Sequence, residues 1–237
     1  MAFCDTIIKN EKYRQENRME LKINLQERCA SMKAFFDWKA DGFDDVHMSL
    51  VESKVAVTKV LPDGIRSVLD LGVGTGMELY ALTERFPDVQ ITGIDISPNM
   101  LEYIRNRPFA DRVKCIVGDF FEVEFGEGYD AVISSSALHH FAPEDKAALY
   151  RKVYDSLRPG GWFVNADRFT DTAEETAEFY RYYEAHKWDS NHCDTPLHVG
   201  LETELLNDAG LRSIRFDPVM TERGYKLLVC RKPKRGE

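Results

Sequence analysis

Between residues 66 and 169, short runs of apolar residues alternate with longer segments of helical character. The apolar runs are continuous, which is typical of strands buried on both faces of a parallel sheet. Successive parallel strands need a crossover connection, usually a helix, and the intervening segments suit one. The expected strands are residues 67–72, 90–97, 113–120, 129–136 and 158–169. The alternation therefore predicts an α/β, doubly wound fold.

The C-terminal part adds two strands of a different kind. Residues 201–209 predict a helix that Gly210 ends, and the runs LRSIRFDPV and GYKLLVCRK follow in close succession. Two strands so close together can pair as a hairpin, which makes one of them antiparallel. We expect a seven-stranded, mostly parallel sheet with a terminal antiparallel strand.

Two segments depart from this rhythm. The N-terminal one is charged with scattered apolar residues and predicts helices. We expect a helical cap over 1–60, a sheet domain over 61–237 and an insertion within that domain at about 171–200. The insertion begins with a helix rich in aromatic residues, which suits either a pocket wall or the interface of a homodimer.

The composition narrows the class of protein. The chain has 237 residues and a formal net charge of −9, which disfavours broad contact with nucleic-acid phosphates. No apolar run approaches the roughly 20 residues of a membrane helix, and the first residues lack the apolar core of a signal peptide. The five cysteines are scattered, so we expect reduced thiols in a cytoplasmic protein, with Cys115 and Cys230 as small core residues.

The most informative stretch joins the first strand to the second. Asp70 is followed by Gly72, Gly74 and Gly76, where a helix begins. Glycines at that point let a ligand approach the backbone, and the second strand ends at Asp95, whose two oxygens suit vicinal ribose hydroxyls. The pattern predicts an adenosine-containing ligand at the carboxyl ends of the strands.

Two classes of such ligand compete. A dinucleotide site has a third Gly or Ala in its motif, and here Met77 holds that position. The carboxylate of Asp70 offers nothing to a pyrophosphate but an ion pair to an ammonium group. The residues therefore favour S-adenosyl-L-methionine, which has a ribose, an ammonium group and no phosphate.

These residues belong to a longer series of motifs. LDLGVGTG, GIDIS, GDFFE, YDAVISSSALHHF and LRPGGWFVNAD occur in this order between about residues 60 and 170. Together they resemble the Rossmann-like (class I) S-adenosylmethionine-dependent methyltransferases, and the closing hairpin extends the resemblance to about residue 231. One glycine motif alone is weak, whereas five blocks in the right order and spacing are specific.

The resemblance implies a set of cofactor-binding residues. The glycine loop would hold the methionine moiety, with Asp70 near its amino group, and Asp95 would hold the ribose. Other positions would contact the adenine or line the path to the sulfonium. The implied set is Asp70, Gly72, Gly74, Gly76, Asp95, Ile96, Met100, Asp119, Phe120 and Ser134.

Aromatic residues near the N-terminus form a lid over the cofactor in this family. The resemblance implies that role for Tyr13, Trp38 and Phe43, although they could equally pack the cap against the sheet.

Candidates for catalysis follow the fourth and fifth strands. His139 and His140 lie where a general base could reach an acceptor near the methyl donor, and packing is the alternative role for at least one of them. Asp167 is a further candidate. We expect no metal, because the loop cluster of His186, His192, Cys193, Asp194 and His198 fits no familiar zinc spacing.

The resemblance implies methyl transfer to a small-molecule acceptor by in-line attack, with S-adenosyl-L-homocysteine as the product. Two alternatives stay open. One is a transferase of the same fold that modifies the wobble uridine of tRNA, which needs a local basic patch. The other is a non-catalytic protein that binds S-adenosylmethionine. A nicotinamide-dependent dehydrogenase ranks below both because of Met77.

Overall fold

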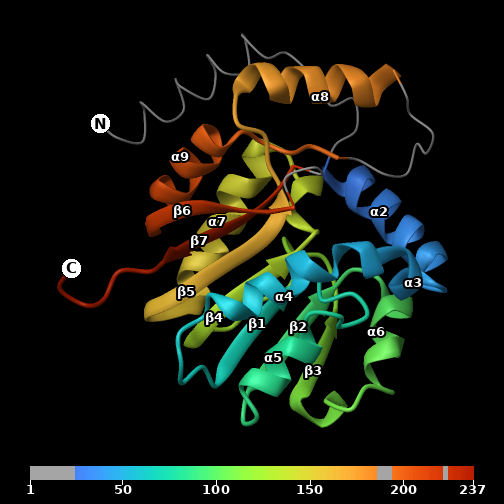
Figure 1. Cartoon of the computed structure of the whole chain (residues 1–237), viewed down its shortest axis with the longest axis vertical. Helices are drawn as coiled ribbons and strands as arrows, with labels where there is room; N and C mark the ends of the chain where they lie inside the picture. Colours follow the sequence, from blue (N-terminus) through green and yellow to red (C-terminus); the bar gives the residue numbers. More distant parts are fainter. Residues whose placement is uncertain (1–24, 186–193, 221–223) are drawn as a thin grey trace.

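The computed structural model describes residues 25–185, 194–220 and 224–237. It contains one mixed sheet with the strand order β3-β2-β1-β4-β5-β7-β6 (Figure 1). The strands are β1 (Ser67–Leu71), β2 (Gln90–Asp95), β3 (Val113–Val117), β4 (Tyr129–Ser135), β5 (Leu157–Arg168), β6 (Arg212–Met220) and β7 (Tyr225–Arg231). Strands β1 to β5 pair in parallel, and β7 pairs antiparallel with both β5 and β6, so β7 alone among the seven strands runs in the opposite direction. The expected fold class is confirmed.

Helices cover both faces of this sheet. The helical elements are α2 (Leu25–Lys39), α3 (Phe43–His47), η1 (Met48–Leu50), α4 (Val51–Lys59), α5 (Leu79–Arg85), α6 (Pro98–Ile104), η2 (Ala110–Arg112), η3 (Leu138–His140), α7 (Pro143–Ser156), α8 (Ala173–Ala185) and α9 (Val199–Ala209). One apolar core packs α4, α5 and α6 against the sheet, and the other packs α7 and α9 against the opposite face. Continuous apolar strands are the consequence of this two-sided burial.

One expectation about the core is wrong. Cys230 is buried, but Cys115 is exposed. The reason is the position of β3 at the edge of the sheet, where only β2 pairs with it and most of its side chains reach solvent. A short apolar run does not reveal whether its strand is central or at an edge.

The N-terminal helices are held against the start of α6 and the turn that follows it. Asp37 of α2 accepts a hydrogen bond from Ser97 Oγ at 2.6 Å, and its carbonyl accepts one from Asn99 Nδ2 at 3.1 Å. Asp44 of α3 forms an ion pair with Arg107. Figure 1 shows α2 and α3 beside α6, at the end of the sheet where β2 finishes. The division into a cap over 1–60 and a sheet domain over 61–237 stays a prediction.

Candidate active site

A cavity of about 230 Å³ lies at the carboxyl ends of the parallel strands. Its walls come from the loops after β1, β2, β3 and β4, from the end of β5 and from the helical elements α2, α3, η1 and α4. The chain reverses its direction of winding between β1 and β4, which are neighbours in the sheet. Ligands of doubly wound proteins bind at this kind of switch point.

The loop after β1 is shaped by its glycines. Gly72 has φ +77°, and a Cβ atom there would lie 2.5 Å from the Cβ of Ala137. The Gly72 N–H donates to the carbonyl of Ile94 at 2.8 Å, which binds the loop to the end of β2. Gly72 and Gly74 line the cavity, whereas Gly76 packs against Ile104 and Phe109.

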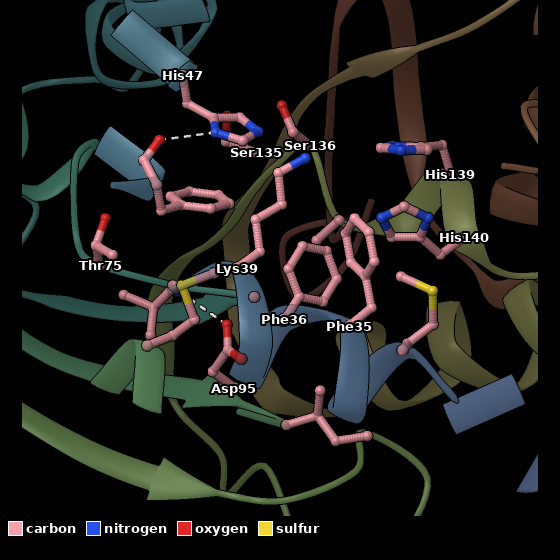
Figure 2. A pocket seen from close by; sticks show the side chains of 18 of the residues that line it. Phe35, Phe36, Lys39, His47, Thr75, Asp95, Ser135, Ser136, His139 and His140 are labelled. Carbon is pink, nitrogen blue, oxygen red and sulfur yellow. Dashed lines mark hydrogen bonds between the residues drawn. The ribbon is translucent and has the colours of Figure 1, made fainter. Parts of the chain in front are cut away.

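Asp95 connects this loop to the next one. Its carboxylate accepts the N–H of Gly74 at 2.8 Å and the N–H of Ser97 at 2.9 Å. The side chain lines the cavity, and burial raises the pKa of Asp95 to about 6 despite these two hydrogen bonds. The second strand thus delivers a carboxylate, fixed in orientation, to the place where the sequence predicts a ribose (Figure 2).

Asp70 does not line the cavity. It is fully buried, and neither carboxylate oxygen has a hydrogen-bond partner among the described residues. Burial and the neighbouring carboxyl of Glu78 hold the pKa of Asp70 well above its usual range. Lys54 of α4, which does line the cavity, pairs with Glu78 at 3.1 Å. The acid that the sequence places near an amino group therefore lies outside the cavity wall.

The other residues of the implied cofactor set divide in the same way. Ser134 is turned away from the cavity, because its hydroxyl donates to the carbonyl of Leu71 at 2.7 Å. The next two residues, Ser135 and Ser136, line the cavity instead. Four further residues of the implied cofactor set line the cavity, namely Ile96, Met100, Asp119 and Phe120.

The cap contributes an aromatic wall. Phe43 lines the cavity and stacks on His47 with ring centroids 3.8 Å apart. Trp38, in contrast, is 75% exposed and lies outside the lining. Phe36, which sequence reasoning missed, lines the cavity, and its ring centroid lies 5.8 Å from that of His140. Tyr13 lies outside the described residues.

Five ionisable side chains meet beyond this wall, near the ends of β4 and β5. His139 Nδ1 lies 2.5 Å from Asp167 Oδ1, and His139 Nε2 lies 3.2 Å from Asp194 Oδ1. The same Asp194 oxygen lies 3.3 Å from His140 Nδ1. Arg168 Nη1 approaches the other oxygen of Asp194 at 2.8 Å. Sequence reasoning named both histidines and Asp167 but missed Arg168 and placed Asp194 in a separate loop cluster.

The two carboxylates determine the charge of His139. Burial lowers the pKa of an imidazole, but Asp167 and Asp194 outweigh it and raise the pKa of His139 to about 9. Burial likewise works to raise the pKa of Asp167, and His139 overcomes it to give about 2. His139 is therefore an imidazolium at neutral pH, hydrogen-bonded to an ionised Asp167.

The strand order, the glycine loop and the carboxylate at the end of β2 are features that this chain shares with class I S-adenosylmethionine-dependent methyltransferases. A family model described as a methyltransferase domain matches residues 68–161, which hold the loop, Asp95 and both cavity histidines.

Curated relatives point to the same family. The malonyl-acyl-carrier-protein O-methyltransferase of Acetivibrio thermocellus is 38% identical over 94 residues, which are 40% of this chain and 32% of that protein. The carboxy-S-adenosyl-L-methionine synthase of Campylobacter curvus is 32% identical over 147 residues, 60% of this chain and 61% of that protein. The chain thus spans between about a third and three fifths of the length of these relatives.

Solved structures share the fold. The DhpI complex with S-adenosylhomocysteine aligns with a TM-score of 0.69 at 20% identity, over 89% of this chain and 99% of that one. Human N-acetylserotonin methyltransferase in complex with S-adenosylmethionine aligns with a TM-score of 0.65 at 20% identity, over 85% of this chain and 57% of that one. In the described part of this chain, no helix has the length and hydrophobicity needed to cross a bilayer.

Proposed function

We propose that this protein transfers a methyl group from S-adenosylmethionine to a small-molecule acceptor. The observation that carries the proposal is the set of residues that line a single cavity. Gly72, Gly74 and Asp95 line this cavity together with His139 and His140, and Figure 2 shows Asp95 apart from the two histidines. A cofactor bound at Asp95 and an acceptor bound at the histidines would be adjacent, as methyl transfer requires.

The cofactor end offers groups that suit an adenosine. Asp95 can accept hydrogen bonds from two ribose hydroxyls while its own orientation is held by Gly74 and Ser97. Ile96 and Met100 supply apolar surface for the adenine, and Asp119 supplies an acceptor for its amino group. Bound here, S-adenosylmethionine would supply an electrophilic methyl group on a sulfonium, so the protein needs mainly to align an acceptor and exclude water.

The acceptor end combines aromatic surface with a proton-handling cluster. Phe36, Phe43 and His47 provide flat surfaces that suit a small organic acceptor. His139 already carries a proton at neutral pH, which makes it a hydrogen-bond donor and a positioning residue rather than a resting base. We assign proton removal from a protonated acceptor to the cluster of His139, His140 and Asp194 as a unit.

A calorimetric titration tests the cofactor half of the proposal. Wild-type protein, Asp95→Ala and Asp88→Ala are titrated with S-adenosylmethionine, S-adenosylhomocysteine and NAD. We expect both sulfur ligands to bind wild-type protein and the control at the exposed Asp88, and to be lost in Asp95→Ala. If neither sulfur ligand binds the wild-type protein, the proposal fails. Turnover is then assayed as release of S-adenosylhomocysteine with a panel of acceptors.

A second candidate function follows from the similarity to carboxy-S-adenosyl-L-methionine synthases. In that case the methyl carbon of the cofactor would lose a proton and bond to a carboxyl group released by a second, carboxylate-donating substrate, rather than be transferred to an acceptor. Lys39, whose ammonium group lies toward Ser135 and Ser136 in the cavity, would suit a carboxylate there (Figure 2). Mass spectrometry of the nucleoside that co-purifies with the protein separates the two candidates, because the carboxylated cofactor is heavier than S-adenosylmethionine.

A further inference from the structure

Two imidazoles and one carboxylate converge in the wall of the cavity. His139, His140 and Asp194 each place one ligand atom so that all three lie within 4.8 Å of one another, and all three residues are buried. Figure 2 shows the two histidines side by side, and their ring centroids are 4.0 Å apart. We propose that these three residues bind one divalent first-row transition-metal ion, which displaces to solvent the proton that His139 Nε2 carries in the metal-free protein.

The distances suit ligands of a common ion. Asp194 Oδ1 lies 3.2 Å from His139 Nε2 and 3.3 Å from His140 Nδ1. Ligand bonds to such an ion are about 2.0–2.2 Å long, so two neighbouring ligand atoms lie roughly 3.0–3.4 Å apart. Two of the three distances between ligand atoms therefore already fall in this range, and the third, between the two histidines, is at most 4.8 Å.

The surroundings orient these ligands as metal sites do. Asp167 lies on Nδ1 of His139 and so directs Nε2 toward Asp194. Asp167 is itself held by the N–H groups of Leu138 and His139 at 2.9 Å and 3.0 Å. A carboxylate behind a histidine ligand is the usual outer-shell partner in such sites. Arg168 holds the second oxygen of Asp194, which leaves Oδ1 directed at the histidines.

The donor set indicates the class of ion. Two imidazole nitrogens with one carboxylate oxygen favour Fe²⁺, Co²⁺, Zn²⁺ or Mn²⁺ over Ca²⁺ and Mg²⁺, which prefer oxygen ligands alone. Three protein ligands leave coordination positions open toward the cavity. The proposal of a metal site does not depend on the proposed methyl transfer. A role for the ion in catalysis does rest on that proposed function, because an oxygen of the acceptor could bind at an open coordination position.

Metal binding to the whole 237-residue chain tests this inference directly. The protein is stripped with a chelator and titrated with Zn²⁺, Mn²⁺ and Co²⁺, and with Fe²⁺ under anaerobic conditions. Bound metal is measured by mass spectrometry and Co²⁺ by its visible absorption. We expect one ion per chain, and at least a tenfold loss of affinity in His140→Ala and in Asp194→Ala. His47→Gln, a histidine of the same cavity outside the cluster, should bind as wild type.

A variant of Asp167 tests its role as the carboxylate that orients the ligand His139. Asp167→Asn should weaken metal binding about 10- to 100-fold and alter the Co²⁺ spectrum without changing the stoichiometry. Circular dichroism confirms that each variant is folded. The proposal is overturned if no ion binds at one per chain, or if His140→Ala and Asp194→Ala bind as tightly as wild type. S-adenosylhomocysteine binding is measured in parallel, so a failed metal site and a failed methyltransferase are distinguished.

Discussion

Asp167 contacts His139 twice: its Oδ1 lies 2.5 Å from the ring Nδ1, and its Oδ2 accepts the backbone N–H of the same residue at 3.0 Å. One carboxylate therefore holds both the ring and the backbone of the first histidine of η3. The consequences for charge, stability and pH dependence follow from this double contact.

Replacing Asp167 by asparagine should uncouple His139 electrostatically. We expect the pKa of His139 to fall from about 9 toward its usual 6.5, because one of its two carboxylate partners is gone. Removing one partner of a buried ion pair should cost about 3 kcal/mol of unfolding free energy. An NMR titration of His139 and urea unfolding measure both effects. Asp217→Asn, in an exposed pair with Arg215, should cost about 1 kcal/mol or less.

The stability of the wild-type protein should fall at alkaline pH. The folded state binds the His139 proton more tightly than the unfolded chain does, so this contribution is fully present below about pH 6.5. It is lost as the pH rises through about 9. Urea midpoints at pH 6.5 and pH 9.5 measure the loss. An equal loss in Asp167→Asn would show that another group is responsible.

Cofactor affinity should fall in acid. Asp95 titrates at about pH 6 in the free protein, and only its ionised form can accept hydrogen bonds from both ribose hydroxyls. Below pH 6 the affinity for S-adenosylhomocysteine should drop, approaching tenfold per pH unit. Calorimetric titrations between pH 5 and pH 8 measure this change in affinity. Asp95→Asn should bind weakly with a flat pH profile, and a steep profile in that variant would contradict the assignment.

An alanine at Gly72 should damage both fold and site. Its Cβ would lie 2.5 Å from the Cβ of Ala137, and the residue would have to keep φ +77°. Strain and overpacking together should cost about 3 kcal/mol, with loss of cofactor binding. Gly64→Ala is the matched control, because its φ is +84° but no atom lies within 4 Å of the new Cβ. It should cost about 1 kcal/mol and leave binding unchanged.

The cap should loosen when its anchor to α6 is removed. Asp37→Ala eliminates the 2.6 Å hydrogen bond from Ser97 Oγ while leaving the sheet intact. We expect faster hydrogen exchange in α2 and faster release of S-adenosylhomocysteine, with little change in global stability. Asp45→Ala, at an exposed acid of α3, is the control. Equal exchange rates in the two variants would show that this bond does not hold the cap.

Local patterns were enough to predict the sheet, the glycine loop after β1 and the acid that ends β2. Continuous apolar runs between helical segments specify a parallel sheet, because each strand must be buried on both faces. The bend after β1 is likewise local, since Gly72 and Gly74 adopt positive φ values that other residues rarely tolerate. Asp95 ends its own strand and therefore reaches the same edge as the glycines.

The charged cluster was decided only by the tertiary structure. His139 and Asp194 are far apart in the sequence, and they meet because β4 and β5 are neighbours in the sheet and the segment at 194–197 folds back over them. Thr195 donates its N–H to the carbonyl of His139 at 2.6 Å, which fixes that return.

The sequence by itself therefore determined the fold class, the glycine loop and the acid at the end of β2, since these depend on periodicity and backbone conformation within short segments. The tertiary structure alone decided that Cys115 is exposed, that Asp70 lies outside the cavity and that Asp194 contacts both histidines. The physical reason is common to all three. Burial and the contacts between distant side chains depend on the order of strands and the path of loops, which no local pattern encodes.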